Sequence, residues 1–172
     1  GSQAMINYAF QNTLTDKEAD SLRTQLLQRY IDKMPDVTNY FHGIHDMLDY
    51  LRTHQITWGV ATNRPRFLVE PLLKKFQLES LSACIVCADC VAQPKPAPDM
   101  LIHACQLAEV DTKDALYVGD TENDMLAAQR ATMPAVFARY GYLREESKNK
   151  EIAYSAAIDT PIELIELLKS TT

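Results

Sequence analysis

The sequence lacks the features that direct a chain to a membrane or to a nucleic acid. No apolar run approaches the roughly 20 residues that a transmembrane helix needs, and no signal peptide is recognisable at the start. Lysine and arginine number 17 against 23 aspartates and glutamates, and the net charge is −6 without any basic block. Because nucleic acids and anionic membranes attract cations, neither is an expected partner. We expect a cytoplasmic protein.

Internal repeats and low-complexity stretches are also absent, which argues against repeat architectures and long disordered segments. The 172 residues suit one domain with room for a small appendage. Hydrophobic residues make up 47% of the chain, enough to form a core.

Four cysteines are present, and three of them, Cys84, Cys87 and Cys90, form a C-x2-C-x2-C pattern. That pattern is compatible with a metal or an iron–sulfur cluster. The surrounding "ACIVC" is typical of a short buried strand, however, and residues three apart in a strand point to opposite faces. We therefore expect reduced, structural thiols that do not converge on one ion.

Residues 1–40 predict helix rather than alternation of strands and helices. Thr15 and Glu18 form a T-x-x-E capping box, and apolar residues follow at helical spacing as far as Met34. Pro35 is expected to help end this helix. We interpret residues 1–40 as a helical appendage.

Residues 41–172 alternate between apolar strand patterns and amphipathic helix patterns, joined by short loops. This alternation predicts an α/β fold, a Rossmann-like parallel sheet with helices on both faces. Strands are expected at 56–62, 83–88, 115–119, 134–139 and 156–158, and helices from 44 to 51 and at 66–76, 98–108, 122–131 and 161–169.

Polar residues follow three of these strands. Thr62 and Asn63 end the first, Lys95 lies in the loop "QPKPAPD" after the second, and Asp120 follows the third, with Asp124 one helical turn later. Ligands of open α/β sheets bind beyond the carboxyl ends of the strands. Carboxylates there suit Mg²⁺, whereas lysine, threonine and free backbone N–H groups suit phosphate oxygens. Together they indicate phosphoryl transfer.

Each of these residues also has a purely structural interpretation. Thr62 is equally able simply to end a strand, and Lys95 to be a solvated loop residue, although the flanking prolines restrict its loop. Thr121 and Asp124 match a T-x-x-D helix cap. The combination on successive strands is what favours a site.

Three motifs carry a resemblance to a known family. The stretches "VATNRPR", "QPKPAPD" and "LYVGDTENDM" resemble the second, third and fourth motifs of the haloacid-dehalogenase superfamily. The stretches "TNRPR" and "KPAPD" are similar to its phosphoglycolate-phosphatase branch, and "YFHGI" resembles the turn by which that branch's helical cap re-enters the core. The resemblance implies a core over 41–172, with 1–40 as part of the cap.

The resemblance also implies roles for the strand-end residues. Thr62 would hydrogen-bond the phosphoryl group with Asn63 beside it, and Lys95 would neutralise charge on the nucleophile and the phosphoryl oxygens. Asp120 would ligate Mg²⁺, and Asp124 would support the metal directly or through water. The substrate would be a small phosphorylated metabolite, hydrolysed through an aspartyl-phosphate.

The first motif of the family, D-x-D-x-T, does not occur in this sequence. Its nearest imitation, residues 8–16, carries Ala9 and Gln11 at the two aspartate positions and fits better as cap helix. In the family fold, the strand with this motif lies between the Thr62 strand and the Asp120 strand. We expect the natural protein to be longer at its N-terminus. The opening "GSQAM" is compatible with a cloning scar before Met5 or with the interior of a longer chain.

A missing central strand would leave two rows of unpaired backbone groups, which is strongly unfavourable. We therefore expect residues 5–10 or a strand swapped from a partner to fill the gap, which makes a homodimer an open possibility. Without the nucleophile the chain is expected to be inactive.

The sequence is compatible with three alternative functions. The first is a Mg²⁺-dependent phosphatase, with 2-phosphoglycolate as leading substrate and a sugar phosphate, including N-acetylmuramate 6-phosphate, close behind. The second is a non-catalytic remnant or pseudoenzyme. The third, a dehalogenase, is disfavoured by Asp120 and Asp124, because that chemistry needs no metal.

Overall fold

The computed structural model describes residues 6, 8–10, 13–141 and 153–171. They belong to two compact units, Gly1–Asn39 with Phe67–Gln77, and Tyr40–Arg66 with Leu78–Thr172. The first break lies next to the predicted boundary at residue 40. Residues 67–77, which the sequence analysis assigned to the α/β core, group with the N-terminal helix instead.

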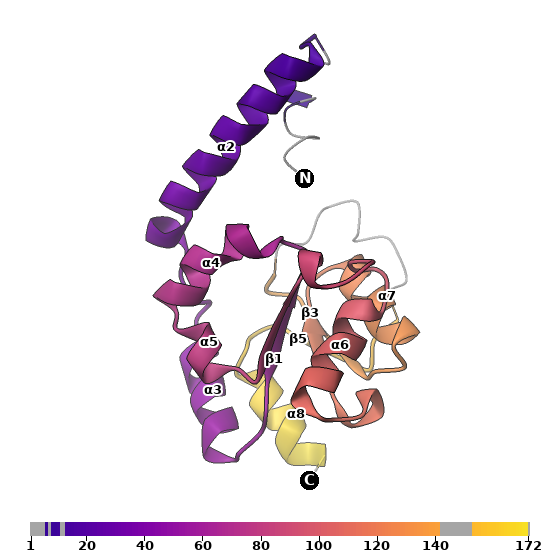
Figure 1. Cartoon of the computed structure of the whole chain (residues 1–172). Helices are drawn as coiled ribbons and strands as arrows, with labels where there is room; N and C mark the ends of the chain where they lie inside the picture. Colours follow the sequence, from indigo (N-terminus) through magenta and orange to yellow (C-terminus); the bar gives the residue numbers. More distant parts are fainter. Residues whose placement is uncertain (1–5, 7, 11–12, 142–152, 172) are drawn as a thin grey trace. The chain divides into compact units, whose positions relative to one another are not determined.

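The first unit is built around the long helix α2, Asp16–Val37, shown in indigo to purple in Figure 1. It begins at the predicted capping box, since Thr15 accepts a hydrogen bond from the backbone of Glu18 and the Glu18 carboxylate reaches back to Thr15. Pro35 lies inside the helix, which ends two residues later than expected. Lys75 Nζ donates to the carbonyls of Thr38, at 2.6 Å, and Pro35, so it satisfies free acceptors at the helix C-terminus.

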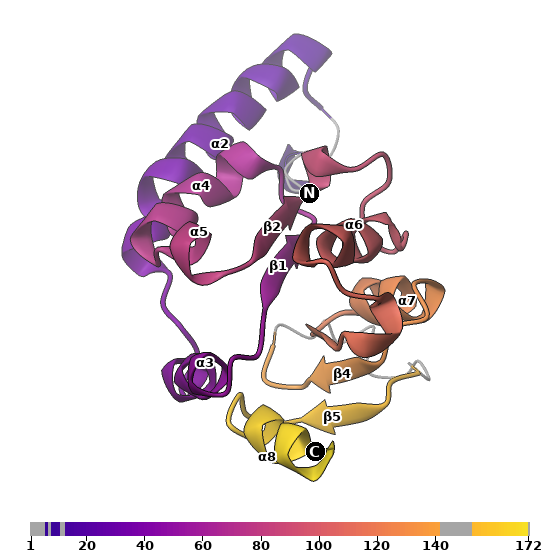
Figure 2. The ribbon, with the colours of Figure 1, turned by 60° about the horizontal axis from the view of Figure 1, so that its bottom comes forward.

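The second unit contains parallel strands in two separate sheets (Figure 2). Strand β1, Gly59–Thr62, pairs with β2, Cys84–Cys87, with Thr62 opposite Cys87. Strands β3, Tyr117–Gly119, β4, Ala135–Ala138, and β5, Ala156–Ile158, form the other sheet in that order. The α/β class with parallel strands is confirmed, but the single sheet that the sequence predicted is divided between β1 and β3.

Helices connect the strands as the alternation predicts. Five of the observed helices begin and end within a few residues of their expected ranges: α3 Ile44–Thr53, α4 Arg66–Lys75, α6 Asp99–Ala108, α7 Glu122–Arg130 and α8 Glu163–Thr171. The short helix α5, Leu78–Leu81, and the 3₁₀ turns at Ala88–Cys90 and Thr112–Asp114 were not expected. Helix α6 packs on β1 and β2, whereas α7 packs on β3 and β4. Within the described part of the chain, no helix has the length and apolar character to cross a membrane.

The main hydrophobic core lies where α6 and α7 meet the strands. Leu101 and Cys105 of α6, Met125 of α7 and Phe137 of β4 are buried in one cluster, with alanines between them. Ala61 of β1 and Tyr117 of β3 pack against the same cluster. Side-chain packing therefore joins the two sheets, which do not share backbone hydrogen bonds.

The strand that the sequence analysis expected to be missing between β1 and β3 is not found in the described residues, and they do not fill its place. Among the residues that the structure describes, no strand pairs with both of them. Ile6 and residues 8–10 are helical, so the expectation that residues 5–10 fill the gap is wrong for the members that are described. A strand supplied by a partner stays a prediction.

Met125 tests the importance of the main core. Its side chain is 2% exposed, and Met125→Ala would leave a cavity at the junction of α7 with the strands. We expect a loss of about 2–5 kcal/mol in the free energy of unfolding, measured by urea denaturation. Gln129→Ala, at an exposed position of the same helix, should change it by less than about 0.5 kcal/mol. Equal losses in the two variants would contradict this account of the core.

Candidate functional site

Lys95 is the centre of the candidate site. Its side chain is only 9% exposed, and its ammonium donates to the Ala61 carbonyl at 2.9 Å, the Tyr117 hydroxyl at 2.7 Å and Asp124 Oδ1 at 2.7 Å. An ammonium group has three N–H donors, and all three have partners. The structure therefore brings Lys95 and Asp124 together as predicted, and Lys95 is not the solvated loop lysine of the alternative interpretation.

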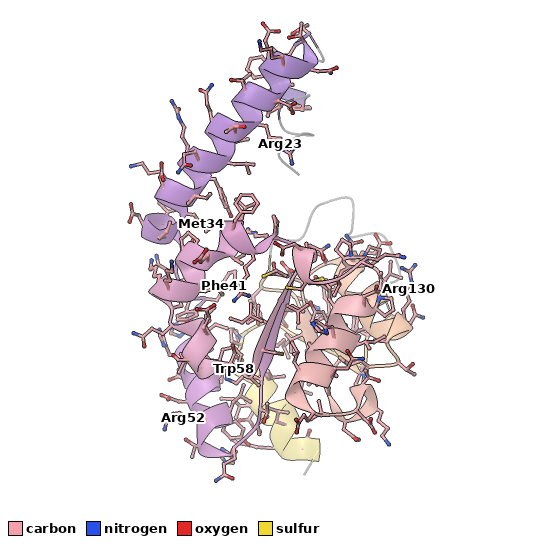
Figure 3. All side chains as sticks on the ribbon, in the orientation of Figure 1. Arg23, Met34, Phe41, Arg52, Trp58 and Arg130 are labelled. Atoms are coloured by element: carbon pink, nitrogen blue, oxygen red, sulfur yellow. The ribbon has the colours of Figure 1, made fainter. Side chains whose placement is uncertain are left out.

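Asn63 fixes the backbone of the Lys95 loop. Its amide nitrogen donates to the Lys95 carbonyl at 2.7 Å, and its amide oxygen accepts from the Lys95 N–H at 2.9 Å. At the far side of the loop, Arg130, labelled in Figure 3, donates to the Pro96 carbonyl at 2.8 Å. Asn63 therefore positions Lys95 in this structure, a function that the sequence analysis did not assign to it.

Thr62 occupies the predicted place, the last residue of β1. Its hydroxyl oxygen accepts a hydrogen bond from the Arg64 N–H at 3.2 Å, which stabilises the turn that follows the strand. The hydroxyl keeps its own hydrogen to donate. Thr62 thus ends the strand and presents a donor at the carboxyl edge of the sheet.

Asp124 caps helix α7 and pairs with Lys95 at the same time. Its Oδ2 accepts from the Thr121 N–H at 3.0 Å and from the Thr121 hydroxyl, which completes the capping box. Its Oδ1 accepts from Lys95 and, at 2.9 Å, from the Tyr117 hydroxyl. The capping interpretation of T-x-x-D is confirmed, and both carboxylate oxygens have partners inside the protein.

The charges in this cluster stabilise one another. Burial alone would raise the pKa of Asp124, but the Lys95 ammonium and the hydroxyls of Thr121 and Tyr117 outweigh burial, and the pKa lies below its ordinary value. Burial, followed by the negative charges of Asp124 and Asp120, raises the pKa of Tyr117 well above its ordinary value. Tyr117 is therefore a protonated donor at neutral pH. The sequence does not single out Tyr117, because a tyrosine inside a strand is usually a core residue.

Two glycines let the backbone come close to the aspartates. A Cβ atom on Gly119 would lie 2.4 Å from Asp124 Cβ, and one on Gly141 would lie 2.2 Å from Asp120 Cβ. Both distances are far below normal contact. Gly141 follows β4, and its close approach to Asp120 joins residues 21 positions apart, so this approach has no local signal in the sequence.

Asp120 follows β3 at the predicted strand end and is half-buried. Its charge raises the pKa of Tyr117, and also that of Tyr140, where burial is the larger cause. Asp120 therefore lies in the same region as the Lys95–Asp124 pair. A carboxylate at this place suits Mg²⁺, which binds proteins through one or two carboxylates and retains several waters.

The prediction that the cysteines of the C-x2-C-x2-C pattern do not converge is correct for Cys84 and Cys87 but wrong for Cys87 and Cys90. Cys84 and Cys87 diverge in β2 as expected, and the Cys84 thiol contacts the Ala104 carbonyl at 3.6 Å. The strand ends at Cys87, however, and the 3₁₀ turn brings Cys90 back, so that the Cys87 N–H donates to Cys90 Sγ at 3.3 Å. Cys87 and Cys90 therefore do converge, together with Asp89. All four cysteines are free of disulfides.

Comparison with known proteins gives consistent matches. The haloacid dehalogenase-like hydrolase family model matches residues 2–138. An N-acetylmuramic acid 6-phosphate phosphatase of Pseudomonas putida is 32% identical over 173 residues, which cover 99% of this chain and 76% of that protein. A phosphoglycolate phosphatase of Xanthomonas campestris pv. campestris is 34% identical over 142 residues, which cover 83% of this chain and 64% of that protein.

A solved structure also resembles this fold. The crystal structure of a predicted phosphoglycolate phosphatase from Haemophilus somnus 129PT superposes with a TM-score of 0.86 and 24% sequence identity, covering 97% of this chain and 75% of that chain. At this level of identity, the likeness concerns the fold alone.

The buried ion pair can be tested by removing its cation. Lys95→Met keeps most of the side-chain volume but leaves Asp124 buried without its charged partner, so we expect a loss of about 3–5 kcal/mol in the free energy of unfolding at neutral pH. The matched control is Arg52→Met on α3 (Figure 3), whose ion pair with Asp49 is 72% exposed on each side and should contribute less than about 1 kcal/mol. If both variants lose the same stability, the Lys95 pair has no special structural role.

The pH dependence of stability provides a second test. Because the folded-state pKa of Asp124 lies below its ordinary value of 3.8, the pair stabilises the protein above that value, and this stabilisation is lost as pH falls through the folded-state pKa. Urea denaturation at several pH values should show a steep loss of stability below about pH 5, with a smaller slope in Lys95→Met. An unchanged slope in that variant would show that other carboxylates cause the acid sensitivity.

Proposed function

Because the chain belongs to the haloacid dehalogenase-like hydrolase family, as its three motifs indicated, we propose that it is part of a Mg²⁺-dependent phosphatase of small phosphomonoesters. Its curated relatives are named phosphatases, which supports a phosphoric monoester hydrolase. The observation that carries the proposal is the buried Lys95 ammonium, which donates to the Ala61 carbonyl of β1 and to the Tyr117 hydroxyl of β3, with Asp120 in the same region.

Each of the strand-end residues contributes a different interaction to the proposed phosphoryl site. Thr62 donates its hydroxyl to a phosphoryl oxygen, and Lys95 supplies positive charge from a loop that Asn63 holds in place. Asp120 holds Mg²⁺, and the ion neutralises charge on the phosphoryl oxygens when bound. Because each oxygen of Asp124 already accepts two hydrogen bonds from the protein, Asp124 supports this site through Lys95 rather than by direct ligation.

The attacking group is not in this sequence. In the proposed reaction, an aspartate of a D-x-D-x-T motif would attack phosphorus and break its bond to the ester oxygen, so that the alcohol leaves and an aspartyl-phosphate forms. Water would then hydrolyse the aspartyl-phosphate to inorganic phosphate and regenerate the aspartate. The sequence has no such motif, so the present chain contains the phosphate-binding and metal-binding parts of the site without the nucleophile. We propose that this chain is inactive by itself.

Two substrates have support from the relatives. Phosphoglycolate is the substrate that the motifs first suggested, and it agrees with the relative named for it. N-acetylmuramic acid 6-phosphate is favoured by a separate observation, because the relative of that name matches 99% of this chain rather than 83%. A match of that extent includes the helical first unit.

A phosphatase assay with Mg²⁺ tests the proposal on the chain itself. We expect no release of phosphate from either substrate, because the nucleophile is absent. Turnover that is abolished both by EDTA and by Asp120→Asn would contradict the proposed inactivity.

The same assay on a longer gene product that carries D-x-D-x-T should give Mg²⁺-dependent turnover, and the relative rates with the two substrates identify the preferred one. Asp120→Asn should reduce kcat/KM by at least about 100-fold because it removes a proposed metal ligand. Asp111→Asn, at an exposed aspartate paired with Lys113, is the control and should have no effect. A longer product that hydrolyses no phosphomonoester would favour the pseudoenzyme.

A further inference from the structure

A second cluster of ligating side chains lies at the end of β2. Cys87 Sγ, Cys90 Sγ and a carboxylate oxygen of Asp89 all lie within 4.8 Å of one another. Cys87 is fully buried, whereas Asp89 and Cys90 are exposed. Within the described residues, this is the one group of three histidine, cysteine or acidic side chains that is so close together. Its members differ from Lys95, Asp120 and Asp124 of the candidate functional site, and Cys87 lies opposite Thr62 in the sheet.

The backbone fixes the positions of these three residues. Cys87 is held in the β-sheet opposite Thr62, and the following 3₁₀ turn directs the Cys87 N–H to Cys90 Sγ. Asp89 is held from the other side, because its two carboxylate oxygens accept from the Arg66 N–H at 3.0 and 3.1 Å. The cluster is thus largely ordered before any ligand binds, which reduces the entropy cost of binding.

We propose that Cys87, Asp89 and Cys90 form a binding site for a thiophilic divalent cation such as Zn²⁺ or Cd²⁺. A C-x2-C pair is half of many zinc sites, and Zn–S distances of about 2.3 Å place two bound sulfurs roughly 3.8 Å apart in a tetrahedral site. The ligand atoms of Cys87, Asp89 and Cys90 lie within 4.8 Å of one another, so the two sulfurs need to approach by only about 1 Å or less to bind one ion. Three protein ligands leave a fourth position for water, on the side where Asp89 and Cys90 are exposed.

Arg66 modulates this site in two ways. Its guanidinium lies near Cys87 and favours the thiolate form, although burial has the larger effect and keeps the pKa of Cys87 raised. The guanidinium also repels a cation, but it is paired with Glu79 at 2.8 Å, which offsets part of its charge. The thiophilic cation is therefore favoured over Mg²⁺, because it gains thiolate bonds that Mg²⁺ does not form.

The test is a titration of the reduced chain with Cd²⁺, followed by the thiolate-to-metal charge-transfer absorption in the ultraviolet. We expect one Cd²⁺ bound per chain, displaced by Zn²⁺. Cys90→Ala should weaken binding by at least about tenfold and lower the absorption, since one thiolate is lost. Cys90 is exposed, so this variant should keep the wild-type circular dichroism and thermal unfolding.

Two further variants make the test specific. Cys84→Ala is the matched control, because Cys84 belongs to the same C-x2-C-x2-C pattern but points to the opposite face of β2. It should bind Cd²⁺ with wild-type affinity, as should Asp120→Asn. An absence of charge-transfer absorption, or equal weakening by Cys90→Ala and Cys84→Ala, would overturn the proposed site.

Discussion

The second unit depends on burying one ammonium group without leaving it unpaired. Moving a charged side chain out of water costs several kcal/mol unless it gains a counter-ion and a full set of hydrogen bonds. Lys95 gains both, from a carbonyl of β1, a hydroxyl of β3 and the carboxylate that caps α7. The loop, the two strands and the helix must therefore keep their relative positions for the ammonium to remain satisfied.

Asp124 shows that one carboxylate can cap a helix and neutralise a buried ammonium group at the same time. The capping box needs an acidic side chain at the third position of α7, and Lys95 needs a buried counter-ion at the same place. Gly119 allows the helix to come close enough for one carboxylate to meet both needs. The two interpretations of T-x-x-D are therefore compatible. Oδ2 of Asp124 caps the helix through Thr121, whereas Oδ1 pairs with Lys95.

The division between β1 and β3 is the other constraint on this unit. The two sheets are joined by packing against α6 and α7 and by the hydrogen bonds of Lys95, without backbone pairing between them. Unpaired strand edges tend to accept another strand. By resemblance to the family, we propose that the strand with the nucleophile occupies this place, next to Thr62, Lys95 and Asp120.

The sequence by itself determined the order of the elements and the chemistry at the strand ends. Apolar periodicity and capping patterns are local, so the helices and strands could be found from short stretches, and Thr62, Lys95 and Asp120 could be placed because parallel strands end at a common edge. Only the tertiary structure decided what those residues touch. The contacts of Asn63 with Lys95 and of Gly141 with Asp120 join distant residues, and the meeting of Cys87 with Cys90 depends on where β2 ends. Such contacts leave no periodic signal, because they are set by the path of the backbone in space.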